Sequence, residues 1–331
     1  MSFGNPNSQL RNVIDLFHNP KIPIILVIEC NFTNFPFFFK DDIMERVERQ
    51  LRWPDKKFKR RIGTSKPVFR AMLEILQADY DKKHELGGAT PELTVGDKLL
   101  ITLKYYREYT TMESIGDDFN CSKSSVHRSI RWVETTLAAD GRFQLLGKEA
   151  LKKSEDGSKD GEVKTVAIDV TEHPTNRPKD SKARTEFYSG KKKRHMIKSQ
   201  IIAALGIIYD VDEAPGSVHD FEICKTTLLL LMVLAVIILA DSGYQGIQAY
   251  HEFSLIPIKK PKNGELAEAE KAYNTALSRQ RIFIENINAK IKVFKIMSHP
   301  YRNRRESHLA RTKLICAILN AEQTWGAVDK A

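Results

Sequence analysis

Three acidic residues of this sequence stand where carboxylates could bind divalent metal ions. Asp169 and Asp241 each follow an apolar run, and Glu285 lies within an amphipathic helical pattern. Cleavage of a phosphodiester without a protein nucleophile uses two divalent metals, one for the attacking oxygen and one for the leaving oxygen. Magnesium prefers a few carboxylate oxygens, completed by water and substrate phosphate. The pattern predicts catalytic and metal-binding roles for Asp169, Asp241 and Glu285, with two Mg²⁺ ions or, alternatively, Mn²⁺.

Each of these acids also has a purely structural interpretation. An Asp at the end of a strand commonly caps a turn, and a single Glu on a helix is usually solvated. Asp210, Asp212, Glu213 and Asp220 are further candidates. We rank them lower because most lie in an expected loop, while Asp220 could cap the following helix. Composition and periodicity do not decide between these sets.

Basic residues accompany Glu285 on its helix. Arg281 lies four positions before it and Lys292 seven after, so the three share a face. A carboxylate aimed at a metal and cations aimed at phosphates would suit DNA binding. The alternative is a helical ion pair between Arg281 and Glu285, worth roughly 0.3–0.5 kcal/mol.

The elements that must position these acids begin after a polar, glycine-containing stretch, 146–162, which we interpret as a linker. Three short β-rich segments and a long helical pattern follow it: Val163–Asp169, Ile197–Leu205, Leu234–Ala240, and Thr275 to Met297. Strands followed by a helix predict an α/β or α+β domain, here 163–322, with Asp169 and Asp241 at strand ends.

The region from Leu93 to Leu137 has helical spacing throughout and predicts three helices. Thr110 precedes Glu113 by three residues, as in a capping box for the second helix. That helix should end near Asn120, with a tight turn before the third. We assign 51–145 to an all-α helix-turn-helix domain and leave 1–50 unassigned, because it shows no sustained period.

The third of these helices has the pattern of a DNA recognition helix. Ser122 can cap it, and its apolar residues recur at intervals of four, three and four. A recognition helix buries one face and projects polar side chains into the major groove. The alternative is a helical bundle with a solvated basic face. The candidate DNA-binding residues on the polar faces are Lys123, Ser124, His127, Arg128 and Arg131.

Composition favours a polyanionic partner. The 331 residues include 52 Lys and Arg against 42 Asp and Glu, a formal charge of +10, and 42% are hydrophobic. The four cysteines form no CxxC pair, which predicts neither a zinc site nor a disulfide framework. The longest apolar run, Leu228–Ala240, is shorter than a membrane helix of about 20 residues. We expect a cytoplasmic, nucleoid-associated protein without a signal peptide.

Several longer motifs lie in order along the second half of the sequence: Phe187–His195, Gly216–Asp220, Ala240–Gly246, Arg281–Asn286, Lys292–Lys295 and Tyr301–Arg305. These motifs resemble those of bacterial insertion-sequence transposases of the insertion sequence five family. They occur in the family's order over about residues 165–320, and the helical region from about 60 to 138 resembles the family's DNA-binding part more weakly.

The resemblance implies a ribonuclease-H-like fold with an Asp-Asp-Glu site at Asp169, Asp241 and Glu285. It also implies that Arg281 and Lys292 contact DNA phosphates. Related transposases carry a Tyr three residues before that Arg, where this chain has Ser278. A basic run would lie on or beside a strand near the DNA path, or else form a solvated hairpin: Lys191, Lys192, Lys193 and Arg194.

The function expected from these features is DNA transposition. The protein would bind the terminal inverted repeats of its element, use water to free a 3′-hydroxyl, and join that hydroxyl to target DNA. A homo-oligomer on double-stranded DNA is expected because two element ends must meet. The alternatives are a catalytically inactive, transposase-derived DNA-binding regulator and a metal-dependent nuclease that cuts without joining.

Overall fold

The computed structural model describes residues 41–85, 87, 92–151, 165–231 and 236–325. Most of the unassigned segment 1–50 and of the expected linker 146–162 lies outside these residues, as do 232–235 of the apolar run. The chain divides into two compact units, Met1–Asp42 and Ile43–Ala331. The second unit contains the core, the sheet and the site. No described helix is long and apolar enough to span a membrane.

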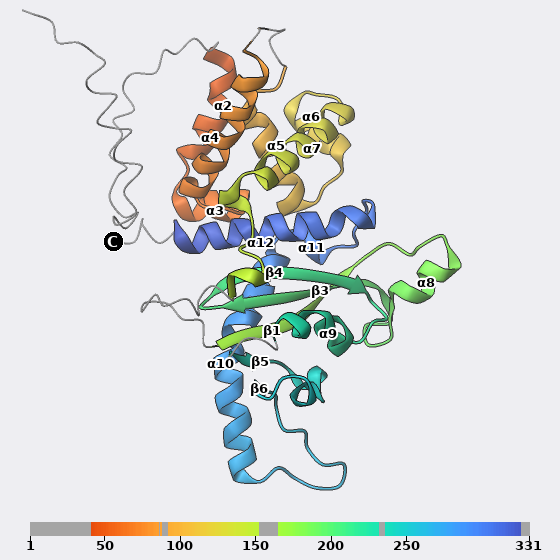
Figure 1. The fold of residues 1–331 in the computed structure, drawn as a ribbon. Helices are drawn as coiled ribbons and strands as arrows, with labels where there is room; N and C mark the ends of the chain where they lie inside the picture. The colour runs from red at the N-terminus through yellow and green to blue at the C-terminus, as the bar shows by residue number, and fades with distance from the viewer. Residues whose placement is uncertain (1–40, 86, 88–91, 152–164, 232–235, 326–331) are drawn as a thin grey trace, which may run out of the picture. The chain divides into compact units, whose positions relative to one another are not determined.

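Helices form the first half of the described chain (Figure 1). Their bounds are α2 Asp41–Leu51, α3 Asp55–Ile62, α4 Lys66–Lys83, α5 Val95–Glu108, α6 Met112–Phe119 and α7 Lys123–Ala139, followed by short 3-10 turns at Gly141–Phe143 and Lys148–Leu151. The lack of a helical period assigned to residues 1–50 is therefore wrong for α2. Its apolar residues Ile43, Val47 and Leu51 recur every four residues, a helical spacing at the end of this segment that the prediction did not use.

The turn between α6 and α7 is set by local residues. Asn120 ends α6 in the left-handed conformation, and the Ser122 side chain accepts a hydrogen bond from the Ser125 backbone at the start of α7. A Cβ on Gly116 would lie 2.5 Å from the Cys121 carbonyl oxygen, so the close turn requires glycine there. The predicted cap of α6 is one residue early, because Thr111 caps it.

The second half contains a six-stranded sheet. Its strands are β1 Thr165–Pro174, β2 Tyr188–Ser189, β3 Arg194–Ala204, β4 Ile207–Pro215, β5 Ile237–Leu239 and β6 Ser254–Leu255. β4 and β1 flank β3 antiparallel, while β5 and β6 continue beyond β1 in parallel, and β2 pairs with the start of β3. This antiparallel meander with parallel strands on the far side of β1 is the ribonuclease-H-like topology predicted from the sequence.

Helices pack on this sheet and connect its strands. They are α8 Ser181–Phe187, α9 Asp220–Leu231, α10 Glu268–Val293, α11 Lys295–Ser298 and α12 His308–Thr324, with 3-10 turns at Ser242–Tyr244 (η5), Ile247–Ala249 (η6) and Arg305–Ser307. α10 begins seven residues before the predicted Thr275, because the Glu270 carboxylate accepts the Ala267 backbone N–H at 2.7 Å.

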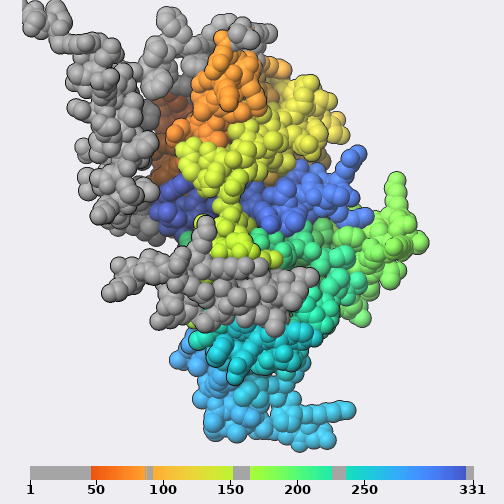
Figure 2. Space-filling model, in the orientation of Figure 1, coloured from red at the N-terminus to blue at the C-terminus, as the bar shows by residue number. Residues whose placement is uncertain are grey.

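One apolar core joins the helical region to the sheet. α12 packs against β4 and also against α4 and α7. In Figure 2 the blue atoms of the C-terminal part lie between the orange and yellow helices and the green strands. The Arg311 guanidinium of α12 reaches Glu134 of α7 with N–O distances of 2.6 and 3.3 Å. The third helix of the helix-turn-helix is thus tied directly to the sheet-bearing part of the chain.

Candidate active site

Asp169 lies in the middle of β1, so the prediction that it ends the strand is wrong. β5 pairs only with residues 165–167 of β1, whereas β3 pairs with it as far as Pro174. The apolar run ends before Asp169, but the strand continues through Pro174. Asp169 consequently lies where β1 extends past the end of β5, and a carboxylate there remains accessible from one edge.

One face of α10 lies over Asp169. Asn288 donates a hydrogen bond from Nδ2 to Asp169 Oδ2 at 2.7 Å, and Arg281 Nη2 lies 3.6 Å from Asp169 Oδ1. Glu285 and Lys292 follow on the same face at helical spacing. Both of their side chains are exposed, whereas Arg281 and Asn288 are buried.

The position of Arg281 differs from the expectation. Its side chain is 9% exposed and is directed at Asp169, so the structure shows a contact with the acid in place of an open phosphate contact. Helical spacing could place Arg281 on the face of Glu285, but it could not show that β1 covers this end of the face. Lys292 lies three turns further along and remains open to solvent.

Asp241 follows β5 and caps the turn η5. Its Oδ1 accepts the backbone N–H of Gly243 at 2.7 Å. A Cβ on Gly243 would lie 2.8 Å from that oxygen, so only glycine leaves the carboxylate its place. The capping role and a role at a metal are therefore compatible for Asp241, because the cap uses only one lone pair of one oxygen.

The pKa of the Asp169 carboxyl depends on the charges of the other two acids. Burial, together with the charges of Asp241 and Glu285, raises the pKa of Asp169 to about 6 against the opposing charge of Arg281. Asp241 and Glu285 thus each lie within electrostatic reach of Asp169. Among the residues that the structure describes, however, no three His, Cys, Asp or Glu side chains lie close enough to hold a metal ion together.

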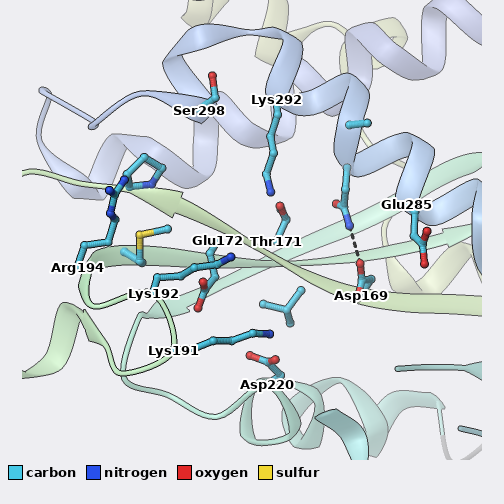
Figure 3. Close-up of a pocket in the computed structure, with 15 residues that line it drawn as sticks. Asp169, Thr171, Glu172, Lys191, Lys192, Arg194, Asp220, Glu285, Lys292 and Ser298 are labelled. Atoms are coloured by element: carbon cyan, nitrogen blue, oxygen red, sulfur yellow. Dashed lines mark hydrogen bonds between the residues drawn. The ribbon is translucent and has the colours of Figure 1, made fainter. Parts of the chain in front are cut away.

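A cavity of about 740 Å³ opens beside Asp169 and Glu285 (Figure 3). Acids from β1, α9 and α10 line one part of it, and cations from the β2–β3 turn and α10 line another. Asp241 lies outside its lining. The charged lining residues are Asp169, Glu172, Asp220, Glu285, Lys191, Lys192, Arg194 and Lys292.

The basic turn at this cavity is built on Ser189. The buried Ser189 hydroxyl donates to Glu172 Oε1 at 3.0 Å and accepts the Lys192 backbone N–H at 3.2 Å. Lys191 through Arg194 are exposed, and Lys193 adopts a left-handed conformation outside the cavity lining. Burial and the nearby Lys192 charge lower the pKa of Lys292, which shows that cations from two elements converge here.

The residues present fit hard divalent cations. Every candidate donor at Asp169, Asp241 and Glu285 is a carboxylate oxygen, the ligand that magnesium and manganese prefer. The Asn288 Oδ1 atom next to Asp169 is buried and has no hydrogen-bond partner among the described residues. An ion with its water shell would supply both the positive charge and the missing donor.

The recognition helix presents the expected side chains to solvent. Val126, Ile130, Val133 and Leu137 of α7 are fully or almost fully buried. The exposed residues are Lys123, Ser124, His127, Arg128 and Arg131. The helix therefore carries a polar, basic face free for a groove of DNA.

Sequence reasoning missed part of the site. Asn288 was not singled out, although its position three residues after Glu285 could have suggested it. Asp220 was ranked low but lines the cavity. Among the other acids, Asp210 and Asp212 pair with Lys148, 3.9 and 2.5 Å away, which leaves them structural roles.

Comparison with known proteins identifies the two regions. Residues 168–320 match the family described as DDE superfamily endonuclease, and residues 91–143 match the helix-turn-helix of DDE superfamily endonuclease. A protein of Microchaete diplosiphon named "Probable transposase for insertion sequence element IS702" is 37% identical over 279 residues, which cover 84% of this chain and 98% of that protein. No solved structure matches the chain. The insertion sequence five subgroup stays a prediction, but the chain belongs to the DDE superfamily of endonucleases and carries its helix-turn-helix region.

Proposed function

We propose that this protein is a DNA transposase that binds the terminal inverted repeats of its element and cleaves and joins DNA strands. The observation that carries the proposal is the placement of Asp169 and Glu285 at one cavity, with Asp241 close enough to raise the Asp169 pKa. The name of the Microchaete relative and the exposed recognition helix support it.

Asp169, Asp241 and Glu285 would hold two divalent cations. When bound, these ions supply activation of the attacking oxygen and stabilisation of the leaving oxygen. Arg281 and Asn288 orient the Asp169 carboxylate, each through one of its oxygens. Arg281 is thereby a positioning residue in this proposal.

The exposed cations at the cavity would bind the DNA phosphates. Lys191, Lys192 and Lys292 line the cavity together with the acids and can approach a DNA backbone that enters it. The face of α7 would contact the element end, with Arg128 and Arg131 at phosphates or base edges. A homo-oligomer would bring two such ends together, and affinity should fall steeply as salt rises.

A strand-transfer assay tests the proposal. Oligonucleotides that carry the element ends are incubated with the protein and Mg²⁺ or Mn²⁺, and nicked and joined products are separated on a gel. The wild type should produce both, and Asp241→Ala should produce neither while it retains DNA binding. Cleavage that survives Asp241→Ala would refute the site. Binding without cutting would indicate a regulator, and cutting without joining a nuclease.

A further inference from the structure

A buried lysine lies beneath the cavity and is shared by two acids. Lys198 of β3 is 9% exposed, and its Nζ donates to the Val218 carbonyl at 2.7 Å and to Asp220 Oδ1 at 2.8 Å. Its register partner on β1 is Glu172, whose Oε1 lies 4.0 Å away. Lysine is almost never buried unless paired, so this ammonium is present to offset nearby negative charge.

The second oxygen of Asp220 faces Asp241. Asp220 Oδ2 lies 3.4 Å, and Asp241 Oδ1 2.8 Å, from the point where a Cβ on Gly243 would stand. The two carboxylates therefore border the same small space, which glycine leaves open. Asp220 also lines the cavity together with Asp169 and Glu285 (Figure 3).

The buried hydroxyl of Tyr244 indicates that a further polar group binds near Asp220 and Asp241. Tyr244 is fully buried, and its hydroxyl has no hydrogen-bond partner among the described residues. Its surroundings include Asp169, Asp220 and Asp241, each of whose charges acts on the phenol. A buried hydroxyl without an acceptor is costly. A water molecule of a cation's shell would donate to this hydroxyl, and a carboxylate turned by that cation would accept from it.

We propose that Asp220 is a fourth carboxylate of the metal site, which acts with Asp241 on one divalent cation, and that Lys198 holds Asp220 in place from below. This inference rests on the proposed two-metal function. Lys198 engages only Oδ1 of Asp220 and so leaves Oδ2 available to the cation. Because Lys198 is itself positive, it should also weaken the binding of the divalent ion.

Binding of Mn²⁺ to the full-length protein without DNA tests this proposal by titration calorimetry. Asp220→Asn should weaken Mn²⁺ binding at least about tenfold, the scale of losses at residues that support metal ligands. Lys198→Met should tighten it several-fold, because a competing positive charge is removed. The matched control is Glu222→Gln on the same helix, an acid paired with Lys225 at 2.5 Å, which should leave affinity within twofold of wild type.

Other variants separate the ways in which the proposal could fail. Affinity within twofold of wild type for Asp220→Asn overturns it, provided that Asp169→Asn and Asp241→Asn bind weakly. If those two also bind as wild type, the two-metal function itself is wrong. Should Asp220→Asn fail to fold because Lys198 loses its partner, the double variant Lys198→Met/Asp220→Asn replaces it and is compared with Lys198→Met alone. Equal Mn²⁺ affinity of these two proteins equally overturns the proposal.

Discussion

Replacing Asp169 with an amide should stabilise the metal-free protein at pH 7, although it should abolish catalysis. The side chain is 17% exposed. Burial raises its pKa from 3.8 to about 6 despite the opposing charge of Arg281, and Asp241 and Glu285 add to the rise. The folded protein therefore disfavours the carboxylate relative to the unfolded chain. In Asp169→Asn the negative charge is gone, while an oxygen remains to accept the hydrogen bond of Asn288.

The difference between the two pKa values fixes the sign and the size of the effect. Protonated Asp169 contributes stability that is fully present below pH 3.8 and is lost as the pH rises through 6. At 1.36 kcal/mol per pKa unit, the loss at pH 7 is about 3 kcal/mol. Asp169→Asn should recover about 3 kcal/mol at pH 7 and only about 1 kcal/mol at pH 4.5, where most of the native carboxyl is already protonated.

Chemical denaturation in EDTA at the two pH values measures this gain. Asp117→Asn, at an exposed position of α6, is the control and should change the free energy of unfolding by less than about 0.5 kcal/mol. Added Mg²⁺ should stabilise the wild type but not Asp169→Asn, because ligands stabilise only the state that binds them. A less stable Asp169→Asn protein at pH 7, or a gain equal at both pH values, would refute the reasoning.

Three further changes probe other parts of the structure. In Glu134→Leu the buried Arg311 loses its ionic partner, so the free energy of unfolding measured in urea should fall by about 3 kcal/mol. The double variant Glu134→Leu/Arg311→Leu should lose less of this free energy. Gly243→Ala places a Cβ 2.8 Å from the carboxylate oxygen that caps η5; strand cleavage should fall more than about tenfold, with duplex binding in gel shifts unchanged. Lys191→Ala/Lys192→Ala should reduce the slope of log affinity against log salt by about 2, roughly 0.9 for each lost phosphate contact, and an unchanged slope would place these lysines off the DNA path.

Local signals allowed the helix-turn-helix to be predicted well. Ser122 caps α7 as expected, and α6 ends at Asn120. The buried stripe of α7 coincides with the predicted apolar positions, since the helical period and capping preferences depend on neighbours only a few residues apart. The one-residue error at Thr111 arose because two adjacent threonines offer equivalent hydroxyls.

The site itself could be predicted only in part, because its geometry depends on long-range pairing. Asp169 was placed at a strand end, but β3 pairs with β1 well beyond it. The burial of Arg281 follows from the contact of α10 with β1, which helical spacing does not contain. Asp220 differs from Asp210 and Asp212 in that it lines the cavity, where it pairs with Lys198, 22 residues earlier on another strand. Residue type and spacing identified the candidate residues, whereas the pairing of the strands determined which of them lie close together.

Two buried cations show how the fold tolerates so many acids in one place. Arg281 lies against Asp169 on the α10 side, and Lys198 lies between Glu172 and Asp220 on the α9 side. Neither restores the ordinary pKa of Asp169, because burial is the largest cause of its rise. Apolar residues in these positions would cost less desolvation energy. Buried cations that hold carboxylates in place in spite of this cost are expected of a site whose acids are kept for binding divalent ions.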